Sequence, residues 1–275
     1  MAITAQDIKK LRDMTDAGMM DCKKALEATE GDFDAAVDFL RKQGLKLAAK
    51  RADREATEGV VIAKVHQSRN YGIVVKVSCE TDFVAKNENF IAFAQTVADL
   101  ILANRPENLE AALALELDGV ALSERIAEQV GRIGEKIELA QYEHLGSSQV
   151  GAYIHTGYKA GVLVAVNQEN AEAFEAAKAV AMQVAAMKPA GVDKDDVDPA
   201  VVIREMEVGK ELARNEGKPE EMLEKIALGR LNKFYKENTL LNQEFVRDSS
   251  KTVAQYLDGV SKGLTVKGFK LVSLG

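Results

Sequence analysis

The sequence has few of the residues on which catalysis, metal binding and disulfide formation depend. Its 275 residues include no tryptophan, three isolated histidines and two cysteines, Cys22 and Cys79, which lie far apart outside any CxxC pattern. Isolated histidines give no metal-ligand spacing, and two distant thiols are typical of a reduced, cytosolic protein. We therefore expect a cytoplasmic protein with no metal and no cofactor.

Long apolar runs and an excess of positive charge are also missing. No apolar run approaches the roughly 20 residues of a membrane span, and the first residues lack the character of a signal peptide. Acidic residues outnumber basic ones by 43 to 36, which gives a net charge of -7. Because phosphate binding needs clustered Lys and Arg, we expect no membrane and no direct nucleic-acid partner.

The phosphate-binding patterns GxxxxGK[ST] and GxGxxG and the nucleophile pattern GxSxG are absent as well. No nucleophile is visibly paired with a base, so we expect a protein that is not an enzyme. Apolar residues at 47% and charged residues at 29% are nevertheless typical of a globular chain. Function must then lie in contact surfaces.

Helical patterns occupy the N-terminal part. Thr4 and Asp7 form a plausible capping pair, and Asp32 is placed to begin a third helix with Phe33, Val37 and Leu40 on one face. The charged residues 46–58 predict a separate, mostly solvated linking helix. We expect residues 1–54 to form an N-terminal helical module with its linker.

An extended pattern begins at Gly59. Residues 60–65 and 73–77 predict two strands of a hairpin, with residues 70–72 in the turn, and residues 136–140 predict a third strand. Residues 151–154 and 161–166 repeat the first two strands, and a helix follows each time. We predict an α+β fold of two related units, each a small antiparallel sheet with helices on one face: 55–145, and 146–189 with 235–275.

A helical segment, residues 190–234, interrupts the second unit. Val201, Val208 and Leu212 lie on one stripe and Leu223, Ile226, Ala227 and Phe234 on another. Gly217 and Pro219 are placed to end one helix and begin the next. The pattern predicts an antiparallel helical hairpin that projects from the body.

The first unit carries five more residues than the second between its second strand and the following helix, on the spacing of Phe90 and Phe174. That region contains Phe83, after Asp82 and before several polar residues. A core phenylalanine is one interpretation, and an exposed wedge that enters a partner's pocket is the other. The spacing leaves both open.

Three further positions have a structural and a functional interpretation. Met19 and Met20 either bury a helix junction, the more common case, or form an adaptable contact surface. His155 at a strand end is by default a structural histidine. Arg12 is by default a solvated surface charge.

Six motifs together resemble the elongation factor Ts family, the guanine-nucleotide exchange factors of bacterial translation. They are LRDMTDAGMMDCKKAL (11–26), NYGIVVKVSCETDFVAK (70–86), GAYIHTGYKAGVLVAV (151–166), MQVAAMKP (182–189), GKPEEMLEKIALGRLNKF (217–234) and SKTVAQYL (250–257). The first motif and TDFVAK in this order are highly specific, and the motifs run nearly from end to end.

The resemblance implies a ubiquitin-associated-like N-terminal module, two core subdomains and an inserted coiled-coil hairpin. It also implies one partner, elongation factor Tu, from which GDP is released when an aspartate and a phenylalanine enter its GTPase domain. The residues that the resemblance assigns to partner contacts are Arg12, Met19, Met20, Asp82, Phe83, Ile133 and His155.

The sequence departs from the family pattern at Asp16, where glycine is usual, and it stops at Gly275, where some members continue into a further helical module. We therefore expect binding to depend on the N-terminal module and the core. The alternative function is an adaptor or chaperone-like module without exchange activity that uses the N-terminal helices and the helical arm. Self-association through that arm is left open.

Overall fold

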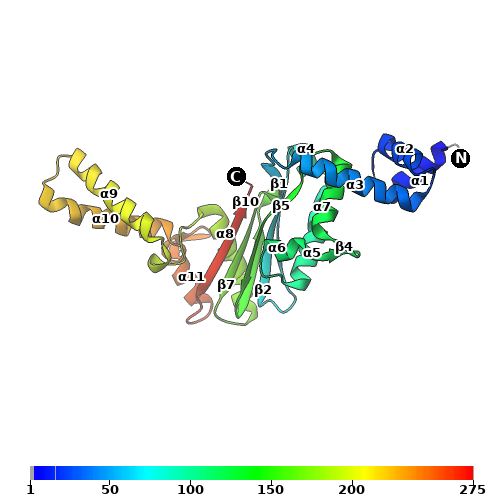
Figure 1. The fold of residues 1–275 in the computed structure, drawn as a ribbon. Helices are drawn as coiled ribbons and strands as arrows, with labels where there is room; N and C mark the ends of the chain where they lie inside the picture. Colours follow the sequence, from blue (N-terminus) through cyan, green and yellow to red (C-terminus); the bar gives the residue numbers. More distant parts are fainter. Residues whose placement is uncertain (1–2, 16, 275) are drawn as a thin grey trace.

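The computed structural model describes residues 3–15 and 17–274, and Asp16 lies outside the described residues. Figure 1 shows two sheets with their helices at the centre, three N-terminal helices at one end and a helical hairpin at the other. The sheets are antiparallel throughout. The α+β class expected from the sequence is confirmed. Within the described residues, each helix is too short or too polar to cross a membrane.

The N-terminal helices are α1 (Ala5–Thr15), α2 (Met19–Ala28) and α3 (Phe33–Arg51). Thr4 and Asp7 exchange the bonds of the predicted capping pair, and the Asp32 carboxylate accepts the amide of Ala35 at 2.9 Å. The helices enclose a small core of their own. Its fully buried members are Leu11, Cys22, Ala25, Leu26 and Ala36.

The prediction of a separate linking helix is wrong, because α3 continues without a break to Arg51. Gly44 does not interrupt it, since α3 crosses α7 (Leu122–Ile133) at this position. A Cβ on Gly44 would lie 2.8 Å from the carbonyl oxygen of Ala127. The second half of α3 is also less solvated than expected, because Leu47 and Ala48 pack against the core of the first sheet.

The two sheets have the same order of strands. The first is β1-β2-β5 and the second is β6-β7-β10, so in each the second strand is central. The predicted hairpin is confirmed, with Val60 opposite Val77. The third strand of the first sheet begins two residues later than expected. The strands are β1 (Glu58–Val65), β2 (Tyr71–Cys79), β5 (Glu138–Gly146), β6 (Gln149–Ile154), β7 (Ala160–Val166) and β10 (Val266–Ser273).

The continuous apolar run in β1 is explained by burial on both faces. Alternation along the strand directs Val60 and Ile62 toward the helices and Val61 and Ala63 toward the second sheet. The sheets approach closely at Gly161, where a Cβ would lie 2.8 Å from Val74. Each sheet therefore has helices on its outer face and the other sheet on its inner face.

The long helices that follow the central strands are α5 (Glu88–Asn104) and α8 (Ala171–Met187), and each has 17 residues. The segment between strand and helix has eight residues in the first unit (80–87) and four in the second (167–170), and in the first unit it contains α4 (Asp82–Ala85). β2 is also two residues longer than β7. The other short elements are α6 (Leu109–Leu113), β3 (Glu116–Leu117), β4 (Val120–Ala121), η1 (Thr156–Tyr158), η2 (Lys194–Asp196), η3 (Leu240–Asn242), β8 (Glu244–Phe245), β9 (Asp248–Thr252) and α11 (Val253–Val260).

The helical hairpin consists of α9 (Pro199–Asn215) and α10 (Glu220–Asn238), so its second helix continues past residue 234. The prediction that Val208 and Leu212 belong to the contact stripe of α9 is wrong, because each is 43% exposed. The seam on α9 is formed instead by Gly209 and Ala213. A Cβ on Gly209 would lie 3.1 Å from the Cα of Ala227, so small side chains bring the two backbones close and leave the larger ones on the flanks.

Candidate partner-binding site

The TDFV segment forms a single helical turn directly after β2. Thr81 caps this turn, since its hydroxyl accepts the amide of Val84 at 3.4 Å. Val84 and Ala85 pack against the core of the first sheet. Because successive residues of a helix point about 100° apart, anchoring these two directs Phe83 away from the core.

Phe83 is 83% exposed, which excludes the interpretation of this residue as part of the core. A phenyl ring left in water has no role in stabilising the isolated chain. An exposed aromatic on an ordered turn is typical of a residue that fills a pocket in a partner. Of the two interpretations that the spacing left open, only the exposed one fits.

Asp82 lies next to Phe83 at the first position of the turn. Its carboxylate binds the ammonium group of Lys86, with an Oδ2–Nζ distance of 2.6 Å. The hydrogen bond from Lys86 lowers the pKa of Asp82 below its ordinary value, and the charge of Lys86 acts in the same direction. Asp82 is therefore a half-exposed anion at neutral pH, where it can accept hydrogen bonds from a partner.

The residues just before the turn are held by two carboxylates. Glu135 accepts the amides of Glu80 and Thr81 at 3.1 and 3.0 Å and the Thr81 hydroxyl at 2.7 Å. Glu80 in return accepts the amide of Lys136 at 2.6 Å. We call these reciprocal bonds between residues 80–81 and 135–136 the carboxylate clamp.

The carboxylate clamp also reaches the end of α3. Arg51 and Arg54 approach the Glu80 carboxylate at 3.1 and 3.0 Å. The pKa of Glu80 is lowered chiefly by the hydrogen bond from the amide of Lys136, and also by Arg54 and Arg51, while burial opposes the shift. The sequence alone did not predict this cluster, because no periodicity or motif pairs residue 80 with residue 135. Its four charged side chains are those of Glu80, Glu135, Arg51 and Arg54.

Met19 and Met20 open α2 with exposed fractions of 51% and 63%. The interpretation in which they bury a helix junction is therefore wrong. Arg12 is exposed on α1 nearby. These residues do not join Phe83: α3 has 19 residues and, at about 1.5 Å per residue, separates the two regions by much of its length of roughly 28 Å.

Ile133 and His155 occupy two further places. Ile133 ends α7 and is partly buried against the core of the first sheet, two residues before Glu135. It thus belongs to the neighbourhood of the TDFV turn. His155 follows β6 in the second sheet and is exposed, with its Nδ1 3.2 Å from the hydroxyl of Tyr153. Its ring also contacts that of Tyr153, so the structural interpretation of His155 still stands beside the functional one.

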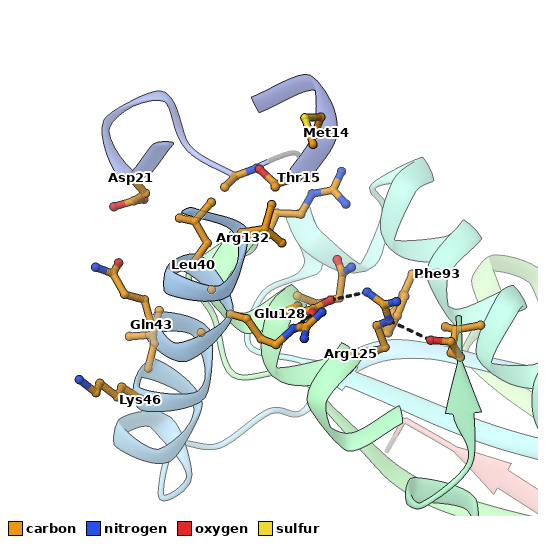
Figure 2. A pocket seen from close by; sticks show the side chains of 18 of the residues that line it. Met14, Thr15, Asp21, Leu40, Gln43, Lys46, Phe93, Arg125, Glu128 and Arg132 are labelled. Atoms are coloured by element: carbon orange, nitrogen blue, oxygen red, sulfur yellow. Dashed lines mark hydrogen bonds and ion pairs between the residues drawn. The ribbon is translucent and has the colours of Figure 1, made fainter. Parts of the chain in front are cut away.

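A cleft of about 680 Å³ lies between the N-terminal helices and α7 (Figure 2). Figure 2 shows Glu128 at its floor, paired with Arg125, and Leu40 and Gln43 on its α3 wall. Arg41 also binds Glu128, at 2.9 Å, and so ties α3 to α7. None of the seven candidate contact residues lines this cleft.

These features, an exposed aromatic on an anchored turn and an exposed methionine pair at the start of α2, are of the kind found in proteins that bind other proteins. The family model described as Elongation factor TS matches residues 80–275. The chain belongs to the elongation factor Ts family.

Curated relatives agree with the family match over the whole chain. The elongation factor Ts of Amoebophilus asiaticus is 53% identical and is covered in full, as is this chain. Those of Cytophaga hutchinsonii and Flavobacterium psychrophilum are 51% and 47% identical, with 99% of each chain covered. The role that the motifs implied, nucleotide exchange in translation elongation, is confirmed at the level of the family.

Proposed function

We propose that this chain binds elongation factor Tu and releases its GDP by inserting Phe83 into the GTPase domain, with Asp82 binding beside it. The observation that carries the proposal is the 83% exposure of Phe83 on a capped turn in a member of this family. Burying a phenyl ring supplies roughly 1.5–3 kcal/mol, available only when the partner opens a pocket for it. That pocket competes with tight nucleotide binding.

Such a mechanism is a coupling between two ligands of one GTPase. If the factor weakens GDP binding by some ratio, GDP must weaken binding of the factor by the same ratio. The productive species is a complex without nucleotide, which either GDP or GTP can dissociate. The factor therefore accelerates exchange in both directions, performs no covalent chemistry and does not itself select GTP.

The remaining candidate residues give the complex its affinity. Met19 and Met20 on α2 are exposed soft thioethers, and Arg12 is an exposed cation on α1, which suits an adaptable contact with a helix. Ile133 extends the surface around the TDFV turn. His155 on the second sheet contacts a different part of the partner, so the GTPase is held at separated points.

The modular organisation belongs to the same proposal. Residues 1–54 form a ubiquitin-associated-like module with its linker, 55–145 the first core subdomain, 146–189 with 235–275 the second, and 190–234 the inserted coiled-coil hairpin. The equal strand order of the two sheets supports a pair of related subdomains. We place the protein in the cytoplasm, with elongation factor Tu as partner and no direct contact to nucleic acid or membrane.

Release of a fluorescent GDP analogue from elongation factor Tu tests the proposal. A small molar fraction of the factor should release all of the analogue in the presence of excess GDP, because each factor molecule acts repeatedly. Raising free GDP should weaken the measured affinity of the factor for the GTPase. Tight binding without faster release would support the adaptor function instead.

A further inference from the structure

The carboxylate clamp lies directly before the exposed turn, and its Glu80 side chain is only 19% exposed. We propose that Glu135 is a positioning residue for nucleotide exchange, because its carboxylate fixes the Thr81 end of α4 and so the direction in which Phe83 is presented. The inference rests on the proposed function and adds to it a residue that acts through Phe83.

The geometry of Glu135 is that of an anchor with three bonds. One carboxylate oxygen accepts two consecutive amides, those of Glu80 and Thr81, and the other accepts the Thr81 hydroxyl. Hydrogen bonds to a charged acceptor are stronger than neutral ones. Because the Thr81 hydroxyl gives its single proton to Glu135, its lone pairs are free to accept the amide of Val84. A continuous chain of bonds therefore runs from Glu135 to the first turn of α4.

The turn needs such an anchor because it is short. A helix of four residues is far below the length at which helices are stable alone, so its conformation depends on what holds its ends. Val84 and Ala85 are held at one end by apolar contacts. At the other end Glu135 supplies the constraint. A ring that is already fixed loses less entropy when it enters a pocket, which favours binding of the activated state.

The second unit joins the segment after β7 to the turn before β10 with different residues, since Asn167 accepts the amide of Thr265 at 2.8 Å and donates to the carbonyl of Gly263 at 2.9 Å. There, residues 167–170 lead from β7 directly to α8, whose first turn is capped by Asn170 accepting the amide of Ala173 at 2.7 Å. Among the described residues, the second unit has no carboxylate that holds a capping hydroxyl as Glu135 holds Thr81, so that bond accompanies the turn that carries Phe83. Glu80 completes it from the opposite side through the amide of Lys136.

A set of variants measured by GDP release separates positioning from general stability. Glu135→Ala is expected to lower kcat/KM for exchange about tenfold, the effect of losing hydrogen bonds to a charged group at the step that uses them. In a Phe83→Ala background the same substitution should change kcat/KM less than about twofold, since the ring that it positions is gone. Glu138→Ala, which removes a nearby carboxylate that pairs with the Lys136 side chain, is the matched control and should exchange normally.

Thr81→Val keeps the side-chain shape and both amide bonds to Glu135 but removes the hydroxyl. It is expected to lower kcat/KM for exchange about threefold. This variant still tests the positioning role if Glu135→Ala lowers the unfolding temperature. Equal losses from Glu135→Ala with and without Phe83 would overturn the proposal, as would wild-type exchange by both Glu135→Ala and Thr81→Val.

A second readout needs no partner. The chain has no tryptophan, so Phe83→Trp introduces a single reporter at the tip of the turn. Adding Glu135→Ala should lower the steady-state fluorescence anisotropy of this tryptophan, whereas adding Glu138→Ala should leave it unchanged. Unchanged anisotropy in the Glu135 variant would overturn the positioning role. Wild-type exchange by Phe83→Ala would instead overturn the proposed function, and the anisotropy would still decide whether Glu135 holds the turn.

Discussion

The Glu135 carboxylate accepts the Thr81 hydroxyl at 2.7 Å, although 54 residues separate the two along the chain. This bond joins the turn after α7 to the turn after β2, and so places α4 against the first sheet. Arg51 and Arg54 bring the end of α3 to the same point. The N-terminal helices and the exposed Phe83 are thereby attached to one polar junction.

Acid should weaken this junction through Glu80. Its folded pKa is lowered, so its carboxylate stabilises the fold above the ordinary value of 4.5, and that stability is lost as the pH falls through the lower folded pKa. Glu80→Gln should therefore be less stable than wild type at pH 7, with the difference shrinking below about pH 4.5. Urea unfolding from pH 7 to pH 3 measures it. A difference that widens in acid would contradict the assignment.

The crossing of α3 and α7 should tolerate no side chain at Gly44. A Cβ there would lie 2.8 Å from a backbone oxygen, so Gly44→Val must separate the helices and should cost roughly 1–3 kcal/mol of the free energy of unfolding. Gly229 is the matched control, since it lies in the exposed part of α10 with nothing within 4 Å of its Cβ position. Gly229→Ala should raise the free energy of unfolding by about 0.5–1 kcal/mol, because alanine favours the helix. Equal effects at both positions would show that the crossing is not tight.

The methionine pair should contribute to affinity and little to folding. Met20 is 63% exposed, so Met20→Ala should change the free energy of unfolding by less than about 0.5 kcal/mol. If the pair contacts elongation factor Tu, the same substitution should raise the dissociation constant about threefold to thirtyfold, the range of a contact worth roughly 1–2 kcal/mol. Titration calorimetry with the GTPase free of nucleotide measures the change. An unchanged affinity together with a lower unfolding temperature would make Met20 a structural residue.

Four strands, β1, β2, β6 and β7, were predictable from the sequence because they are rich in apolar residues and bounded by turn residues. The hairpin of β1 and β2 and its counterpart β6 and β7 follow from those runs alone. The end of α3 was not predictable, since Gly44 and the charged residues after it suggest a break. The helix continues because α7 packs against it at Gly44 and because Leu47 and Ala48 pack against the core of the first sheet.

The site was predictable in part. A comparison of the two units located the additional residues around Phe83, but spacing alone could not distinguish a buried ring from an exposed one. That distinction depends on Val84 and Ala85, which take the inward positions of the turn. The carboxylate clamp lay beyond sequence reasoning, because Glu80 and Glu135 meet only when β2 and the turn after α7 are brought together by the sheet.

Phe83 is the residue that should drive nucleotide release, and its truncation gives the sharpest experiment. The measurement is the rate of fluorescent GDP release from elongation factor Tu catalysed by wild type, Phe83→Ala and Leu45→Ala, an exposed apolar residue on α3 as control. Phe83→Ala should lose about tenfold to a hundredfold of kcat/KM, as expected for a dominant contact, while unfolding at the wild-type temperature. Leu45→Ala should match wild type. Equal rates for all three proteins would exclude Phe83 as the residue that drives release.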